Sequence, residues 1–303
     1  MHDVNLTKLN TEQQNERTLA IDTFSTAEIL AVINQEDQKV ALAVKEALLN
    51  IEELVEVIVD RLTKGGRLVY IGAGSSGLLA YSDAIECPPT YGISFDKILA
   101  FTAEDLLPFC EAEAAAEDNC EKAIADLTGC SLSGGDVLVA IAASGRTPYA
   151  LAALQYGKEV GCYCGAISCV KDSAMSRIAD TAIEVITGPE VITGSTRMKA
   201  GTAQKMVLNM LSTASMIRMG KVYDNLMVDM MPINEKLVKR AKTIITRITG
   251  CELAVAEDYY QRAAGNTKIA SLMILTGLNK EETEALLADN GDHLKKALQA
   301  FSE

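Results

Sequence analysis

Apolar and polar residues alternate in blocks along the middle of the chain, a pattern typical of short strands separated by helices. Helical segments, with apolar residues at three- and four-residue spacing, include 104–127 and 148–161. Strands without polar alternation, each followed by a helix, predict a parallel sheet that is covered on both faces. The expected strands are rich in apolar and β-branched residues and cover 67–74, 97–103, 136–144, 162–168 and 181–188.

Helical patterns also flank this region. The run from residue 25 to residue 62 begins with Ser25 or Thr26 as an N-cap, with Glu28 placed for a capping box. From about Asn234 the chain reads as amphipathic helices separated at glycines. We therefore expect an α/β three-layer sandwich with a central, mostly parallel sheet. Its expected domains are an N-terminal helical segment, a sheet domain and a small C-terminal helical module, at 1–53, 54–233 and 234–303.

The charge balance excludes several classes of partner. The 28 Lys and Arg residues against 41 Asp and Glu residues give a formal net charge of −13, and no basic run interrupts this excess. Nucleic acids and anionic membrane surfaces are therefore not expected as partners. A phosphorylated small molecule remains compatible, because backbone N–H groups at a helix N-terminus attract anions locally. The sequence shows no signal region and no apolar run of about 20 residues, so a cytoplasmic protein is expected.

Cysteine and histidine usage narrows the chemistry. Eight cysteines lie inside apolar patterns of a long chain, which favours reduced thiols, and Cys162 and Cys164 do not form a CxxC pair. We expect no metal site. The two histidines, His2 and His293, lie near the termini, so a Ser-His or Cys-His mechanism lacks its base. Carboxylates or a lysine must then move protons in any acid–base reaction.

A glycine- and serine-rich turn follows the first expected strand. The sequence IGAGSSGLLAYSDAIECPPTYG (71–92) has the strand, turn and helix order of a phosphate cradle, with Ser75 and Ser76 as candidate binding residues. It lacks the lysine of a P-loop and the acidic residue of a dinucleotide fingerprint. The alternative is a tight turn that needs glycine only for close packing. Glu86 follows within one short helix, so binding and chemistry could share this region.

A second turn of similar composition follows the third expected strand. It carries the candidate binding residues Ser144, Gly145, Arg146 and Thr147, and the next residue is a proline suited to the first turn of a helix. Ligands of parallel sheets bind beyond the carboxyl ends of the strands, so the turns after residues 71, 143 and 186 are expected near one site. Two such turns favour a phosphorylated metabolite over a packing role. The alternative for Arg146 is a surface ion pair.

The third turn leads into a long apolar helix. Ser195 or Thr196 could cap this helix, which would place Arg197 and Lys199 in its first turns. Basic residues there oppose the helix dipole unless an anion or a carboxylate lies nearby. Because of this local conflict, Ser195, Thr196 and Lys199 are added to the candidate binding residues.

Long motifs in these segments resemble the N-acetylmuramic acid 6-phosphate etherase family. ECPPTYG and GSTRMKAGTAQK are the most specific of them, and the resemblance covers nearly the whole chain. It implies a sugar isomerase (SIS) fold, a homodimer, a phosphorylated amino-sugar substrate, no cofactor, and a carbon–oxygen lyase reaction that cleaves an ether. The stretches that carry the resemblance are 12–37, 71–92, 142–149, 188–213 and 221–229.

The resemblance also implies two catalytic carboxylates. The glutamate of the ECPPT motif, Glu86, corresponds to the proton donor, and Glu117 in AAEDN corresponds to its acid/base partner. The ether to be cleaved lies β to the carbonyl of the open-chain sugar. Removal of the C2 proton therefore permits elimination of lactate, and water then adds back. From the residues alone, Glu117 reads equally as part of a solvated acidic helix.

Two departures from the family pattern bear on this interpretation. Leu78 stands in the first turn where the family commonly has arginine, and Glu16 stands where it usually has proline. Both expected catalytic positions are unaffected. Two alternatives on the same fold remain: a non-catalytic regulator that senses sugar phosphates, and a sugar-phosphate isomerase.

Overall fold

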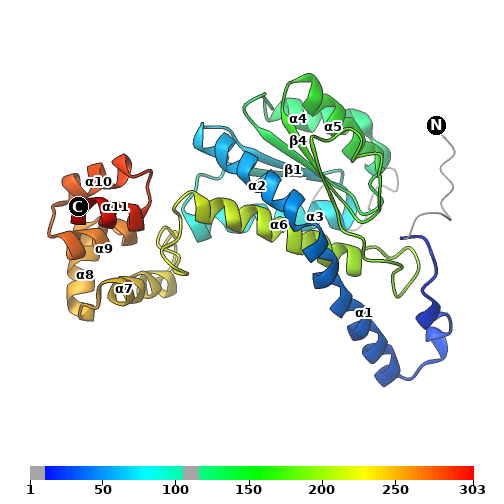
Figure 1. Ribbon diagram of the computed structural model, residues 1–303, viewed down its shortest axis with the longest axis horizontal. Coiled ribbons are helices and arrows are strands. Elements are labelled where there is room, and N and C mark those ends of the chain that lie inside the picture. Colours follow the sequence, from blue (N-terminus) through cyan, green and yellow to red (C-terminus); the bar gives the residue numbers. More distant parts are fainter. Residues whose placement is uncertain (1–10, 105–115) are drawn as a thin grey trace. The chain divides into compact units, whose positions relative to one another are not determined.

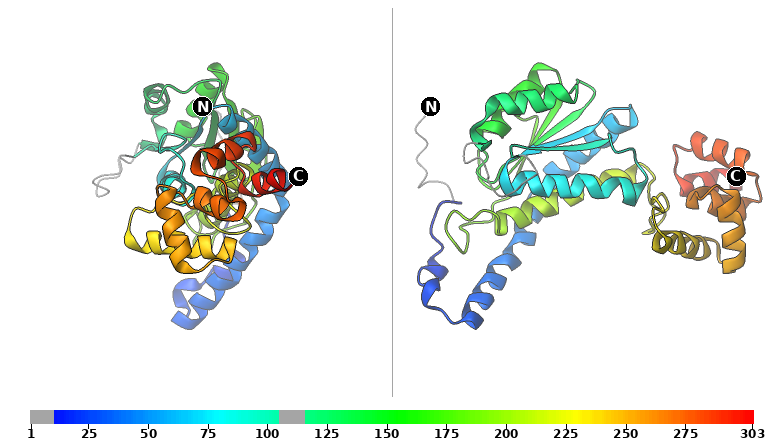
Figure 2. Two further views of the ribbon diagram at one scale, coloured as in Figure 1. Left: turned by 90° about the vertical axis from the view of Figure 1, so that its left-hand side faces the viewer. Right: turned by 180° about the vertical axis from the view of Figure 1, so that it is seen from behind.

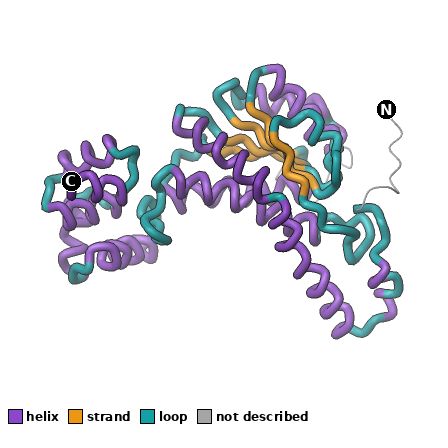
Figure 3. Tube along the Cα trace, in the orientation of Figure 1, coloured by secondary structure: helices purple, strands orange, loops and turns teal. Residues whose placement is uncertain are grey.

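The computed structural model describes residues 11–104 and 116–303, and five parallel strands form its central sheet (Figures 1 and 3). Their order across the sheet is β2-β1-β3-β4-β5. The five predicted strands and the parallel α/β sheet are confirmed. The strands are β1 (Leu68–Gly72), β2 (Ile98–Thr102), β3 (Val137–Ile141), β4 (Tyr163–Ser168) and β5 (Thr181–Glu184).

The strand order creates a switch point between β1 and β3. Gly72, the last residue of β1, lies opposite Thr102 of β2 and Ile141 of β3. After β1 the chain forms β2 on one side of this strand, and it later forms β3 on the other side. Open parallel sheets bind ligands outside the carboxyl ends of strands at such a point. The topology therefore marks the ends of β1 and β3 as the place for a site.

Helices α4 (Cys120–Gly129) and α5 (Pro148–Glu159) cover one face of the sheet (Figure 2). Their apolar residues pack on alternate residues of the central strands, including Ile71, Leu138 and Cys164, all of which are buried. Gly157 of α5 permits a close approach, because a Cβ atom there would lie 2.7 Å from Leu138 Cδ2. The absence of polar alternation in the central strands β1, β3 and β4 follows from coverage on both faces.

Helices α2 (Leu48–Thr63), α3 (Gly74–Tyr91) and α6 (Lys199–Arg218) lie on the other face. A buried polar contact joins two of them: Asp83 of α3 accepts hydrogen bonds from Asn209 (2.6 Å) and Ser212 (3.0 Å) of α6. Tyr70 of β1 donates to the same carboxylate at 3.4 Å. Burial raises the pKa of Asp83, and these hydrogen bonds partly offset that rise.

The predicted N-terminal helical run is present but forms two helices. Helix α1 (Thr26–Glu46) begins with the expected capping box, in which Ser25 and Glu28 exchange hydrogen bonds. Ala47 separates it from α2. Two short 3-10 helices, η2 (Glu16–Thr18) and η3 (Ile21–Thr23), precede α1.

The chain divides into two compact units: Met1–Ala84 with Asp96–Ser212, and Ile85–Phe95 with Thr213–Glu303. The second unit holds a separate apolar core, which includes Ala241, Ile245 and Leu272. The expected domain boundaries stay predictions. No helix within the described ranges is both long and apolar enough to cross a membrane. The helices of the second unit's core are α7 (Glu235–Thr249), α8 (Leu253–Arg262), α9 (Thr267–Thr276), α10 (Lys280–Asp289) and α11 (Leu294–Ser302).

Candidate functional site

A cavity of about 400 Å³ lies at the carboxyl ends of β1 and β3. The turns after these two strands line it, and the loop after β5 adds Gly194 and Thr196. The prediction that three turns far apart in sequence meet at one site is confirmed. The predicted binding residues among its lining are Ser75, Ser76, Ser144, Arg146, Thr147 and Thr196.

The first turn has the close packing that the sequence left open as an alternative, while its role in phosphate binding stays a prediction. A Cβ atom on Gly77 would lie 2.5 Å from Thr102 Oγ1, so close packing requires glycine there. The Gly74 N–H donates to the Glu104 carboxylate at 2.9 Å, so a side chain already occupies part of the anion-attracting end of α3. Ser75 is exposed toward the cavity, whereas Leu78, the departure from the family pattern, does not line it.

Ser76 lines the cavity but has a partner within the protein. Its hydroxyl donates to Gln204 Oε1 of α6 at 3.0 Å, and only 8% of the residue is exposed. Gln204 Nε2 is buried and finds no hydrogen-bond partner among the described residues. The Ser76 hydroxyl therefore orders the wall of the cavity, while its role in binding stays a prediction.

The second turn is shaped by Gly145, which does not itself line the cavity. Gly145 has a φ of +63°, and a Cβ atom there would lie 2.4 Å from Ser173 Cβ, so only glycine fits. Arg146 forms no ion pair within the described ranges. The alternative role of Arg146 in a surface ion pair thus finds no partner among the described residues.

The cavity lining also contains carboxylates. Glu117 lies on the 3-10 helix η4 (Ala116–Asp118), is exposed, and lines the cavity together with Asp118. Residues 111–115 of the acidic stretch lie outside the described residues. Glu12 is a third lining carboxylate, from the N-terminal segment. Sequence reasoning missed Glu12 and Asp118 as lining residues, although Glu12 belongs to a stretch that carries the family resemblance.

Glu86 does not line this cavity. It is exposed on α3, belongs to the second compact unit, and precedes the buried residues Cys87 and Pro88. Its role as the proton donor stays a prediction.

The predicted cap of α6 is wrong. The helix begins at Lys199 rather than directly after Ser195 or Thr196, and its first N–H groups donate to the carboxylate of Glu190. The two distances are 3.0 Å from the Lys199 nitrogen and 2.9 Å from the Ala200 nitrogen. A carboxylate thus compensates the dipole, as the charge conflict in the sequence required. Ser195 does not line the cavity.

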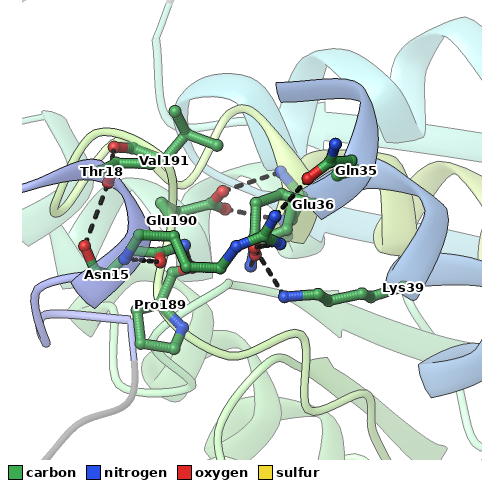
Figure 4. Close-up of polar contacts among 11 residues, drawn as sticks. Asn15, Thr18, Gln35, Glu36, Lys39, Pro189, Glu190 and Val191 are labelled. Carbon is green, nitrogen blue, oxygen red and sulfur yellow. Dashed lines mark hydrogen bonds and ion pairs between the residues drawn. The ribbon is translucent and has the colours of Figure 1, made fainter. Parts of the chain in front are cut away.

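Lys199 is also absent from the cavity lining. Its Nζ forms an ion pair with Glu36 Oε2 at 2.8 Å, and both side chains are 1% exposed. Arg17 (2.9 Å) and Lys39 (2.6 Å) bind the other oxygen of this carboxylate (Figure 4). Burial raises the pKa of Glu36, but hydrogen bonds and charges from Lys199 and Lys39 outweigh burial and hold it at about 2.

This cluster anchors the N-terminal segment that carries Glu12. Asn15 Nδ2 donates to the Pro189 carbonyl at 3.4 Å, and Thr18 Oγ1 donates to the Val191 carbonyl at 2.8 Å (Figure 4). The segment is therefore tied to the loop after β5, which itself contributes to the cavity. Glu36 lies on α1 and pairs with Arg17 of the N-terminal segment and with Lys199 of α6. These ion pairs therefore connect the segment to both helices.

Comparisons with known proteins agree with this geometry. Residues 33–169 match the SIS domain family. The N-acetylmuramic acid 6-phosphate etherase of Geobacillus sp. (strain WCH70) is 50% identical over 295 residues, covering 97% of this chain and 100% of the relative. The enzyme of the same name from Histophilus somni (strain 129Pt) is 49% identical over 291 residues, covering 96% of each.

Solved structures share the fold. A protein of E. coli CFT073, solved as a complex, has a TM-score of 0.50 at 19% identity, covering 67% of this chain and 97% of that one. A putative phosphosugar isomerase from Bacteroides fragilis NCTC 9343 also has a TM-score of 0.50, at 23% identity, covering 65% and 94%. At these identities the likeness concerns the fold alone.

Proposed function

Because the chain belongs to the N-acetylmuramic acid 6-phosphate etherase family, we propose that it cleaves the D-lactyl ether of N-acetylmuramic acid 6-phosphate with water. The products are N-acetylglucosamine 6-phosphate and D-lactate, in the recycling or catabolism of cell-wall amino sugars. One observation carries the proposal: the cavity at the switch point combines hydroxyls and Arg146 on its two turns with the carboxylate of Glu117.

The cavity lining offers groups for the phosphate and for the sugar of this substrate. A phosphate suits the guanidinium of Arg146 and the hydroxyls of Ser144 and Thr147, because charge-assisted hydrogen bonds from arginine are short and bidentate. Ser75 and Thr196 supply further hydroxyls. The acetamido and hydroxyl groups of the sugar would then lie toward the carboxylates, which can only accept hydrogen bonds when ionised.

The reaction needs two groups in opposite protonation states. An ionised carboxylate removes the C2 proton of the open-chain sugar, a C2–C3 double bond forms, and the C3–O bond breaks. A protonated carboxyl gives its proton to the departing lactate oxygen. Water then adds across the double bond, with hydroxide to C3 and a proton to C2, so the net reaction consumes one water molecule. We assign these steps to Glu117 and Glu86, with Glu86 as the proton donor.

The active form is proposed to be a cytoplasmic homodimer that uses no cofactor. The negative charge of the chain supports a small anionic substrate held by local groups rather than a polyanionic partner.

Purified protein incubated with N-acetylmuramic acid 6-phosphate should release D-lactate. Solvent labelled with ¹⁸O should appear at C3 of the sugar product, as elimination followed by hydration requires. If the wild-type protein released no lactate, the etherase proposal would fail. Aldose–ketose conversion of a sugar phosphate without lactate would support the isomerase alternative instead, and tight binding of sugar phosphates without turnover would support the regulator.

A further inference from the structure

Helix α7 belongs to the second unit (Figure 1). Its sequence has a basic face in an otherwise acidic chain. Residues three and four apart share one face of a helix, so the spacing of four cationic residues of α7 places them within a single stripe. Each of them is exposed, whereas Ile244 and Ile245 pack toward the core. The four cations of the stripe are Lys236, Lys239, Arg240 and Arg247.

None of these four cations forms an ion pair within residues 11–104 and 116–303. Lys242, on the same helix but off the stripe, shows the contrast because it pairs with Glu257. Like charges three and four residues apart repel one another. Lys236 also lies in the first turn of α7, where a cation opposes the helix dipole. The stripe therefore concentrates positive charge that the described residues leave uncompensated.

The stripe borders a cavity of about 420 Å³ within this unit. The facing wall is the segment Asn225 to Met227, part of the KVYDNLMVD stretch that carried the family resemblance. A tight turn holds this wall, since the Leu226 N–H donates to the Tyr223 carbonyl at 2.8 Å. The accessible wall of this cavity is mainly apolar, with Leu226, Met227 and Ile244 among its lining residues, and the four cations stand at its border.

The segment is also anchored at its ends. Lys221 Nζ lies 3.2 Å from Asp229 Oδ2 and 2.9 Å from Asp292 Oδ2, and Lys268 lies 2.7 Å from the same oxygen of Asp229. Lys268 is almost fully buried, at 2% side-chain exposure. These internal ion pairs hold the segment that forms the facing wall of the cavity.

We propose that this cavity binds a phosphorylated small molecule. Arg240 and Arg247 suit a phosphate because guanidinium groups bind it bidentately, and the lysines add charge. The Asn225 amide and the Thr243 hydroxyl are placed in the lining for polar groups of the ligand, and the apolar part suits its carbon skeleton. The volume falls within the range of about 300–1,000 Å³ that is typical of small-ligand sites.

Two sources share this chemistry: a second molecule of the reaction's own sugar phosphate, bound in addition to the one at the switch point, and a separate phosphorylated metabolite that acts as an effector. Calorimetric titration with N-acetylglucosamine 6-phosphate, inorganic phosphate and unphosphorylated N-acetylglucosamine tests for the site. The test variant is the double substitution Arg240→Ala and Arg247→Ala. The matched control is Lys242→Ala, which also removes a positive charge from α7. Circular dichroism and thermal melting verify that both variants fold.

We expect the double variant to bind the sugar phosphate about tenfold or more weakly than the control, because two charge-assisted hydrogen bonds are lost. The double variant and the control should bind the unphosphorylated sugar with similar affinity. A parallel rise in KM for D-lactate release would identify a second molecule of the reaction's own sugar phosphate as the occupant. If KM stayed unchanged while the titration of the double variant lost one set of binding sites, the occupant would be an effector.

The proposal would be overturned if the double variant bound N-acetylglucosamine 6-phosphate as tightly as Lys242→Ala does. This outcome is independent of the proposed reaction, which fails only if the wild-type protein releases no D-lactate. A binding titration needs no turnover, so the two results are separable.

Discussion

Lys199 and Glu36 form a buried ion pair across 163 positions of sequence, with Nζ and Oε2 2.8 Å apart and both side chains 1% exposed. The pair joins the first turn of α6 to α1, and Arg17 and Lys39 share the same carboxylate. Removal of one partner of a buried pair leaves the other charge uncompensated, which makes this contact a test of how the N-terminal segment is held.

Glu36→Gln should therefore lower the free energy of unfolding by about 3–5 kcal/mol, because Lys199 remains buried without a counter-charge. Urea denaturation measures this change. Asp60→Asn, which breaks the exposed pair with Lys64, is the control and should cost at most about 1 kcal/mol. Equal losses in the two variants would show that the Glu36 cluster does not stabilise the fold.

The same carboxylate predicts a dependence of stability on acid. The pKa of Glu36 is lowered from 4.5 to about 2 in the folded protein, so its stabilising contribution is complete above the unfolded pKa and is lost as pH falls through the folded one. Between about pH 5 and pH 2 the wild-type protein should lose about 3 kcal/mol more stability than Glu36→Gln. Parallel urea titrations at several pH values measure the difference. Identical pH profiles would contradict this assignment.

Arg146→Ala should raise KM for N-acetylmuramic acid 6-phosphate by about tenfold to a hundredfold, because a charge-assisted contact with the phosphate is lost. The value of kcat should change less, and Arg146→Lys should recover part of the affinity. Arg177→Ala is the control, since Arg177 is exposed and does not line the cavity. A KM for Arg146→Ala equal to that of the control would remove this residue from the site.

Glu117→Gln should lower kcat by about 10²-fold to 10⁴-fold while changing KM little, because the amide can neither accept the C2 proton nor return it. Asp118→Asn is the matched control, since its carboxylate lies on the same 3-10 helix and lines the same cavity. We expect the control to retain more than about one tenth of the wild-type kcat. Equal losses would assign the chemistry to the acidic stretch rather than to Glu117 itself.

Glu12→Gln should raise KM about tenfold with folding unchanged, because an accepting carboxylate at the cavity becomes an amide. Gln13→Glu, which adds charge at the next position outside that lining, is the control. Arg17→Ala should raise KM in the same direction by loosening the segment, and should also speed proteolytic cleavage near residue 17. Faster proteolysis without a change in KM would separate the anchor from the site.

The sheet could be predicted because its central strands β1, β3 and β4 are buried on both faces, which leaves apolar runs such as those around Ile71 and Val139. The convergence of the turns at Ser75 and Ser144 followed from a general property of parallel sheets. Both inferences depend on local composition and on topology. Neither requires knowledge of a specific long-range contact.

The contacts that escaped prediction are those between residues distant in sequence. Glu104 accepts a hydrogen bond from the Gly74 N–H across 30 positions of sequence, and Glu12 lines the cavity from the N-terminal segment. The start of α6 was misplaced because its cap is the carboxylate of Glu190, nine residues before the Lys199 N–H, rather than an adjacent hydroxyl. Local capping rules do not identify such a residue.

The carboxylate of Glu104 has a consequence for where an anion can bind in the cavity. It accepts a hydrogen bond from the N–H of Gly74 at 2.9 Å, so a negative group of the protein itself lies at this end of α3. A phosphate brought to that N–H meets repulsion, whereas the guanidinium of Arg146 attracts it. The protein thus fills one anion-binding position with its own side chain, which directs a phosphate toward the second turn.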